Sequence, residues 1–224
     1  MNRHFFNIIE QYMLKCMSDS AHDKEHVYRV LYTALDIAQS EKKVDYDILI
    51  TACLLHDIGR KEQFEDPTLC HAAVGAQKAH SFLTENGYDP IFSDNVSRCI
   101  RVHRFRSSDP PVTIEEKILF DADKIDVTGT IGIARSLLYR GKQEEPLYLL
   151  DENGCVSNGE NDTAPSFLKE YKYKLEKLYS RFYTKRGKEI ALERQRSAKD
   201  FYENMLKELK NSYAMKNQIN LIIK

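Results

Sequence analysis

The sequence predicts an all-α fold, and three observations support that class. Apolar residues recur three and four positions apart in nearly every segment, as they do on one face of a helix. Glycine stands at the expected C-terminal ends of two helices, where its backbone freedom suits the turn that follows. No segment shows the long alternation of apolar and polar residues that marks a β-strand. We therefore expect a helical bundle with a C-terminal helical extension and a long polar loop.

The first 140 residues contain closely spaced helical patterns. Valine, leucine and alanine repeat at helical intervals over residues 27–38, and Gly59 and Gly87 follow two of the other patterns. Thr113 and Glu116 have the spacing of a capping box, which predicts the start of a further helix. Helices are accordingly expected over residues 1–19, 22–39, 46–58 and 70–86, from about residue 93, and over 114–126 and 130–139.

The character of the chain changes after residue 140. Residues 141–165 are rich in glycine, asparagine and acidic residues. Turn signals such as Asn153-Gly154 predict a flexible, exposed loop there, with a short hairpin as one option. Residues 166–224 are expected to be C-terminal helices, and the strongly charged part from Ser166 to about Lys216 is expected to form two long helices, broken near Arg186-Gly187.

Length and composition narrow the class of protein. No linker clearly divides the chain, so we expect one domain over residues 1–224, with residues 1–140 as its functional core. The net charge is −1, which gives no electrostatic reason for bulk nucleic acid or anionic membrane as a partner. No apolar run reaches the roughly 20 residues that cross a bilayer, and the first residues lack the features of a secretory signal. The five cysteines are odd in number and lack a CxxC pair, which suits a cytoplasmic protein, either a monomer or a homodimer.

Histidine and aspartate interrupt the apolar faces of two expected helices. His26 lies next to the core face of the helix over 22–39, and His56 lies on the core face of the next helix, directly before Asp57. If these helices pack as neighbours, the three side chains converge. Imidazole and carboxylate groups are ligands that first-row divalent metals accept readily, whereas a buried aspartate without a cation or a donor is costly. The pattern therefore indicates a divalent-metal site.

The expected helix over 114–126 supplies a further acid. It carries Asp121, Asp123 and Asp126 among apolar residues that occupy most of its buried arc. At least one of these aspartates should point inward and complete a site of two histidines and two aspartates. The pattern alone does not choose between Asp121 and Asp123, and it leaves Asp126 either as a site residue or as the polar edge of the helix.

The order H…HD…D, formed by His26, His56-Asp57 and Asp123, resembles the signature of the HD superfamily of metal-dependent phosphohydrolases. The stretch Ala122-Asp123-Lys124-Ile125 is similar to the context in which that family carries its last acid, which favours Asp123 over Asp121. The likeness is closest to a bacterial subgroup of small HD hydrolases and runs from about Ser20 to Tyr139. The further motifs that carry it are Arg29 three residues after the first histidine, CHAAVGA at residues 70–76, HRF at 103–105 and DADKIDVTGTIGIAR at 121–135.

The resemblance implies an HD-domain helical bundle and a metal held by His26, His56, Asp57 and Asp123. We expect manganese first, with nickel, cobalt, iron, magnesium and zinc as alternatives. The implied activity is hydrolysis of nucleoside or deoxynucleoside triphosphates to monophosphate and pyrophosphate through a metal-activated water. One alternative is another HD phosphomonoesterase or phosphodiesterase, such as a 5′-nucleotidase or a cyclic-nucleotide hydrolase. An alternative of a different class is a nucleotide-sensing module without turnover.

Cationic and further histidine side chains complete the expected site. Arg29, Lys124 and Arg60, in that order, are the candidates for contact with substrate phosphates, and surface ion pairs are the other reading of these residues. His71 and His103 stand where other HD enzymes place additional site histidines. They suit a phosphate contact, a general acid or a second metal ion, and we expect a single-ion site that they support. His4, His22 and His80 are expected to be structural or surface groups.

Overall fold

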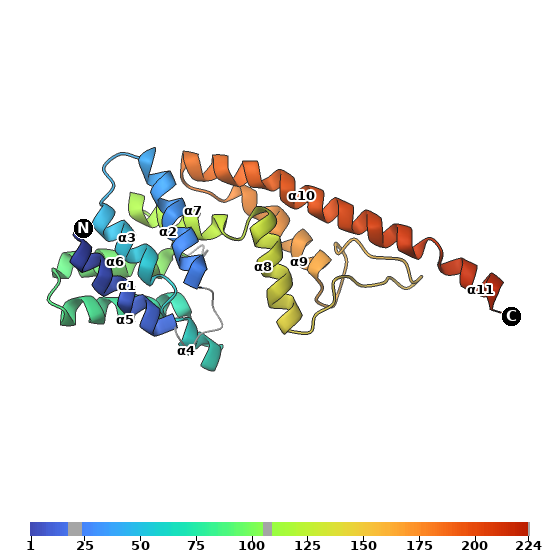
Figure 1. The fold of residues 1–224 in the computed structure, drawn as a ribbon, viewed down its shortest axis with the longest axis horizontal. Coiled ribbons are helices and arrows are strands. Elements are labelled where there is room, and N and C mark those ends of the chain that lie inside the picture. The colour runs from blue at the N-terminus through green and yellow to red at the C-terminus, as the bar shows by residue number, and fades with distance from the viewer. Residues whose placement is uncertain (18–23, 105–108, 224) are drawn as a thin grey trace. The chain divides into compact units, whose positions relative to one another are not determined.

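The computed structural model describes residues 1–17, 24–104 and 109–223, and it confirms the all-α class (Figure 1). Within these ranges no β-strand occurs, and the extended pairing is a single antiparallel bridge between Leu150 and Val156. That bridge flanks Asn153-Gly154, so a short hairpin does form there. Across the same ranges no helix combines the length and the hydropathy needed to cross a bilayer.

The described chain forms two compact units, Met1–Asp126 with Phe182–Gly187, and Val127–Arg181 with Lys188–Lys224. The expectation of one domain over the whole chain stays a prediction. The helices of the first unit are α1 (Arg3–Met17), α2 (Lys24–Gln39), α3 (Tyr46–Leu55), α4 (Arg60–Glu65), α5 (His71–Glu85), α6 (Pro90–Val102) and α7 (Ile114–Ile125).

The core of the first unit lies where α2, α3, α6 and α7 meet. Helix α2 packs against both α3 and α7, while α6 packs against α3, α5 and α7. Val30, Ala34 and Leu49 are fully buried in this core, as the helical pattern predicts. Because the apolar faces of these helices point to one centre, the polar residues that interrupt them are brought together as well.

Capping side chains set the starts of α3 and α7. Asp45 accepts hydrogen bonds from the backbone N–H groups of Asp47 and Ile48, at 3.0 and 3.1 Å. Thr113 Oγ1 accepts from Glu116 N at 3.3 Å, as the capping box predicts. The Glu116 carboxylate accepts from Val112 N at 2.6 Å, one residue earlier than in the usual box.

Helix α3 ends earlier than the helix expected over 46–58. It stops at Leu55, and His56 is its C-cap, so His56 and Asp57 lie in a turn before α4. Gly59 permits this turn, because a Cβ atom there would meet His71 O and lie 2.6 Å from Gly75 N. Residues 56–58, which we expected to form the last turn of the helix, therefore form, together with Gly59, a turn that lies close to α5.

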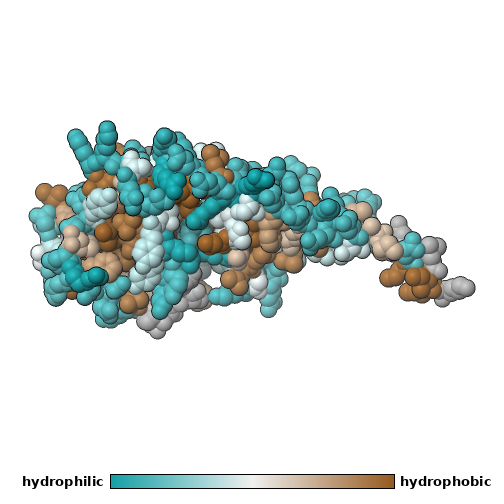
Figure 2. Space-filling view, turned by 45° about the horizontal axis from the view of Figure 1, so that its top comes forward, coloured by the Kyte–Doolittle hydropathy of each residue, from teal (hydrophilic) through white to brown (hydrophobic). Residues whose placement is uncertain are grey.

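The second unit contains α8 (Gly129–Lys142), α9 (Phe167–Tyr173), the 3₁₀ helix η1 (Leu175–Ser180), most of α10 (Lys185–Tyr213), the 3₁₀ helix η2 (Lys216–Gln218) and α11 (Ile219–Ile222). Helix α11 presents Ile219 and Ile222 to solvent, 58% and 76% exposed. Figure 2 shows this hydrophobic group at the C-terminal end of the chain.

The prediction of two long helices broken near Arg186-Gly187 is wrong. Short helices α9 and η1 come first, and a single long helix, α10, then starts at Lys185. Gly187 lies in its first turn, where a Cβ atom would come within 2.6 Å of both Asp121 Oδ2 and Thr184 Oγ1. The glycine thus admits a buried carboxylate to the start of α10 and does not break the helix.

Candidate metal centre

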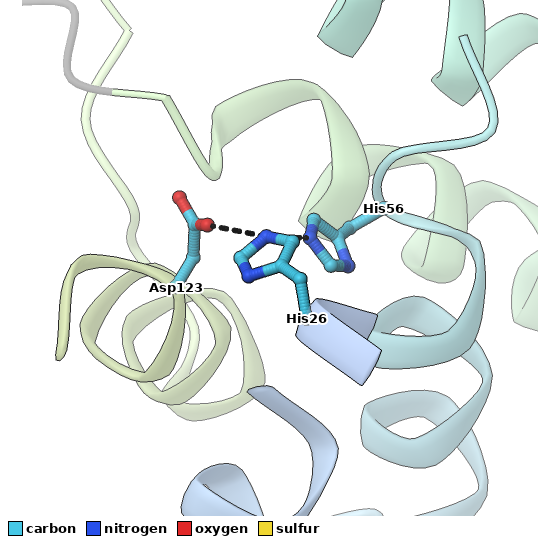
Figure 3. A group of neighbouring side chains, drawn as sticks. All are labelled: His26, His56 and Asp123. Atoms are coloured by element: carbon cyan, nitrogen blue, oxygen red, sulfur yellow. Dashed lines mark hydrogen bonds and ion pairs between the residues drawn. The ribbon is translucent and has the colours of Figure 1, made fainter. Parts of the chain in front are cut away.

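Three elements of the first unit bring the four predicted metal ligands together. His26 comes from α2, His56 and Asp57 from the turn after α3, and Asp123 from the last turn of α7. His26 Nε2 lies 3.3 Å from His56 Nε2, 3.4 Å from Asp123 Oδ1 and 3.6 Å from Asp57 Oδ2. Figure 3 shows both imidazoles and the Asp123 carboxylate pointing toward one another. We call these four side chains the first cluster.

The other carboxylate oxygen of Asp57, Oδ1, faces two further histidines. We call Asp57, His71 and His103 the second cluster. His71, the first residue of α5, places Nε2 3.5 Å from Asp57 Oδ1, and His103, the C-cap of α6, places Nε2 3.8 Å from it. Neither of these two buried nitrogens has a hydrogen-bond partner among the described residues. The Asp57 carboxylate therefore stands between two pairs of imidazoles.

The tautomers of all four histidines follow from their Nδ1 contacts. Each Nδ1 faces an oxygen that can only accept, so each Nδ1 carries a hydrogen and donates it. The acceptors are Asp126 Oδ2 for His26 at 2.7 Å, Cys53 O for His56 at 2.7 Å, Gln63 Oε1 for His71 at 2.7 Å and Ile100 O for His103 at 2.6 Å. In its neutral form each of these histidines therefore has a lone pair on Nε2 directed toward Asp57, which is the arrangement found around a bound cation.

Most of these groups keep their neutral or anionic metal-binding form at neutral pH. Burial lowers the pKa of His71 to about 2, with help from Arg60, and it lowers the pKa of His103 to about 3. Burial also lowers the pKa of His56. For Asp57 burial acts in the opposite direction, but His56 and Arg60 outweigh it and hold the carboxyl pKa well below its usual range.

His26 differs from the other three histidines. Burial opposes its charged form, but hydrogen bonds with Asp123 and Asp126, together with the charge of Asp57, raise its pKa to about 9. A proton on His26 then offsets part of the negative charge that the carboxylates bring to the first cluster. A divalent cation would take over that role, and the set of imidazole nitrogens and carboxylate oxygens fits a first-row divalent metal.

The predicted phosphate-contact residues lie around the ligands, each paired with a carboxylate. Arg60 Nε donates to Asp57 Oδ1 at 2.9 Å, and Lys124 Nζ donates to Asp123 Oδ2 at 2.7 Å. The opposite oxygens, Asp57 Oδ2 and Asp123 Oδ1, face the first cluster. Arg29 holds Asp126, which is not a member of either cluster.

The structure separates the roles of Asp121 and Asp123. Asp121 accepts hydrogen bonds from Tyr183 N at 2.9 Å and from Thr184 N and Oγ1, both at 2.7 Å, so it anchors the segment that starts α10. Asp123 belongs to the first cluster. The family resemblance favours Asp123 over Asp121, and Asp123 is also the aspartate that lies beside His26 and His56.

Two further polar residues support the site. Asp126 accepts a hydrogen bond from His26, so it contacts one of the predicted ligands and is not only the polar edge of its helix. Gln63 holds His71, and no sequence signal pointed to it.

His80 is a surface group paired with Asp94 at 3.1 Å, as expected. The expectations for His22 and for Phe105 in the HRF motif lie outside the described residues, as do the expected helix ends at residues 19 and 22.

Comparisons with known proteins place this geometry in a family context. The HD domain family model matches residues 24–128. The uncharacterized protein YpgQ of Bacillus subtilis is 27% identical over 190 residues, 85% of each chain. Among solved structures, the Lin1889 protein of Listeria innocua has a TM-score of 0.70 at 26% identity, over 94% of this chain and 98% of that one. An HD-superfamily hydrolase of Bacillus thuringiensis has a TM-score of 0.69 at 26% identity, over 92% and 97%. Bacillus subtilis YpgQ has also been crystallised in complex with ADP; that structure has a TM-score of 0.69 at 25% identity, over 91% and 97%.

Proposed function

We propose that this chain, in which residues 24–128 match the HD domain family model, is a divalent-metal-dependent phosphohydrolase that acts on nucleotides. The observation that carries the proposal is the convergence of four imidazole Nε2 atoms on one buried carboxylate, Asp57. Such a concentration of lone pairs and negative charge in a buried place calls for a cation. The HD-superfamily hydrolase of Bacillus thuringiensis, which shares the fold at 26% identity, supports a hydrolytic role.

We propose that His26, His56, Asp57 through Oδ2 and Asp123 through Oδ1 hold one divalent ion, manganese before the other first-row metals. A bound ion of this kind lowers the pKa of a coordinated water and polarises a phosphoryl oxygen. Four protein ligands leave positions for water and substrate on an ion that prefers six.

The second cluster has a different role in this proposal. Arg60 already donates to Asp57 Oδ1, the one carboxylate oxygen that the second cluster offers, so this cluster has less negative charge for a second ion. His71 and His103 present lone pairs at Nε2 and have no hydrogen there to give to a phosphate oxygen. We infer that they accept hydrogen bonds from water and help to orient the attacking molecule.

The substrate is proposed to be a nucleoside triphosphate, cleaved to monophosphate and pyrophosphate. Three cationic side chains are close to the ligands and partly open to solvent: Arg29 is 32%, Arg60 27% and Lys124 19% exposed. Cations in such positions suit a substrate that carries several phosphates. The ADP complex of Bacillus subtilis YpgQ supports a nucleotide as the ligand.

The test is a screen of ribo- and deoxyribonucleoside triphosphates on metal-stripped protein with Mn²⁺, Co²⁺, Ni²⁺ or Mg²⁺ added. We expect turnover with release of pyrophosphate, and its loss in Asp57→Ala. His80→Ala is the matched control, because it removes a surface histidine and should leave the rate unchanged. Release of orthophosphate or triphosphate would move the assignment to another phosphohydrolase class. Nucleotide binding without turnover under any metal would overturn the enzymatic proposal in favour of a sensing module.

A further inference from the structure

We propose that Asp126 is a positioning residue that fixes one metal ligand, His26, and one phosphate-contact residue, Arg29, with a single carboxylate. The inference rests on the proposed function, because it assigns Asp126 a role relative to a bound ion and a bound phosphate. It goes beyond that function in coupling the two binding sites through a residue that touches neither ligand.

The contacts of Asp126 carry the inference. Asp126 is the C-cap of α7 and is 3% exposed. Its Oδ2 accepts from His26 Nδ1 at 2.7 Å and from Arg29 Nη2 at 3.1 Å, and its Oδ1 accepts from Arg29 Nε at 2.7 Å. His26 and Arg29 are three residues apart on α2 and so share one helix face. One carboxylate thus reaches both residues of that face.

For His26, the contact fixes both the ring and its tautomer. The Nδ1 hydrogen is donated to Asp126, so Nε2 is the atom that faces Asp57 and Asp123. Of the four site histidines, His26 has a carboxylate as its Nδ1 acceptor, while the other three donate to neutral oxygens. A carboxylate in that position makes an imidazole a stronger metal ligand.

For Arg29, the contact fixes the plane of the guanidinium group. Two of its nitrogens bind the two oxygens of Asp126, a paired geometry that restricts the side chain more than one hydrogen bond would. The Arg29 side chain is 32% exposed, whereas that of Asp126 is 4% exposed. A guanidinium held in place from the buried side loses less entropy when a phosphate binds from the solvent side.

Asp121 provides a matched control within α7. It is also a buried aspartate, but it accepts from Tyr183 N and from Thr184 and lies outside both clusters. Asp121→Asn and Asp126→Asn therefore each remove one buried charge from α7. Their effects on stability can be similar in kind, while their effects on the metal centre should differ.

The experiment compares both variants with the wild-type protein in three measurements. In calorimetric titrations of metal-stripped protein with Mn²⁺, Asp126→Asn should bind about 10- to 100-fold more weakly, and Asp121→Asn as tightly as wild type. In proton NMR of the metal-free protein, the low-field Nδ1 proton of His26, assigned by its loss in His26→Gln, should move upfield in Asp126→Asn and stay in place in Asp121→Asn. In steady-state assays, Asp126→Asn should raise KM for the nucleotide, and adding it to Arg29→Met should raise KM little further.

The outcomes separate this inference from the proposed function. Mn²⁺ affinity and a His26 proton signal that are both unchanged in Asp126→Asn would overturn the positioning role. A wild-type protein that binds Mn²⁺ but hydrolyses no nucleotide would overturn the function, while the titration and the NMR comparison would still decide the role of Asp126. Asp126→Glu keeps the buried charge and moves the carboxylate by one methylene. It gives the same comparison, with an expected loss of affinity, if Asp126→Asn does not fold.

Discussion

Lowering the pH should weaken Mn²⁺ binding, because His26 holds a proton in the metal-free protein. Hydrogen bonds with Asp123 and Asp126 overcome the effect of burial and raise the pKa of His26 to about 9. An ion that binds at Nε2 must displace that proton, and at pH 7 the group lies about two pKa units below its titration midpoint. At about 1.4 kcal/mol per unit, displacement opposes binding by about 2.7 kcal/mol, or about 100-fold in affinity relative to a pH well above 9.

The direction and the pH window follow from the groups that titrate. The raised pKa means that His26 is protonated below about pH 9, so each step toward acid strengthens the competing proton. The other ligands do not titrate in this window, because the pKa values of His56, Asp57 and Asp123 are lowered from their ordinary values. Affinity should therefore rise about tenfold per pH unit between pH 6 and 8, and level off near pH 9.

Isothermal titration of metal-stripped protein with Mn²⁺ at pH 6, 7 and 8 measures this dependence. Repeating the titrations in buffers of different ionisation enthalpy gives the number of protons released, which should be close to one per ion at pH 7. A histidine with an ordinary pKa would release only a fraction of a proton there. Equal affinities at pH 6 and 8, or no proton release at pH 7, would refute the assignment of the proton to His26.

Three further predictions follow from the same geometry. Asp57→Ala should lose Mn²⁺ binding and nucleotide hydrolysis in calorimetry and product assays, with the helical circular-dichroism signal retained; full activity would contradict the site. His71→Gln and His103→Gln should each lower kcat by about 100-fold with Mn²⁺ affinity nearly unchanged, and a comparable loss of affinity would instead place an ion in the second cluster. Because the pKa values of His71 and His103 are lowered to about 2 and 3, the unfolded chain binds protons below pH 6.5 that the folded protein does not. Urea unfolding of metal-free protein should therefore show a free energy of unfolding that falls from pH 6.5 to 5 by up to about 1.4 kcal/mol per pH unit for each of these histidines; a constant value would contradict their burial as neutral groups.

Several features of the site could be predicted because they depend on local pattern. The helical spacing of apolar residues identified α2 and α7, which carry His26 and Asp123, and α3, which ends just before His56. The polar residues that interrupt these apolar faces indicated an inward-facing polar site. Thr113 also caps its helix by accepting from Glu116 N, as predicted. Local reasoning failed where distant segments meet. Gly59 and Gly187 were read as helix ends or breaks, but both admit close contacts with other parts of the chain.

The sequence by itself determined the helical class, the positions of the ligand-bearing helices and the order of the residues that match the HD pattern. Tertiary structure decided which aspartate of α7 faces the site. Residues 121 and 123 point about 200° apart at 3.6 residues per turn, so periodicity says that they face different ways but not which of them faces α2. Packing of α7 against α2 turns Asp123 to the first cluster and leaves Asp121 for the start of α10. The packing of the other helices likewise places Asp57 between two pairs of imidazoles. The direction of a side chain from its own helix is set locally, but its neighbours depend on how whole helices pack.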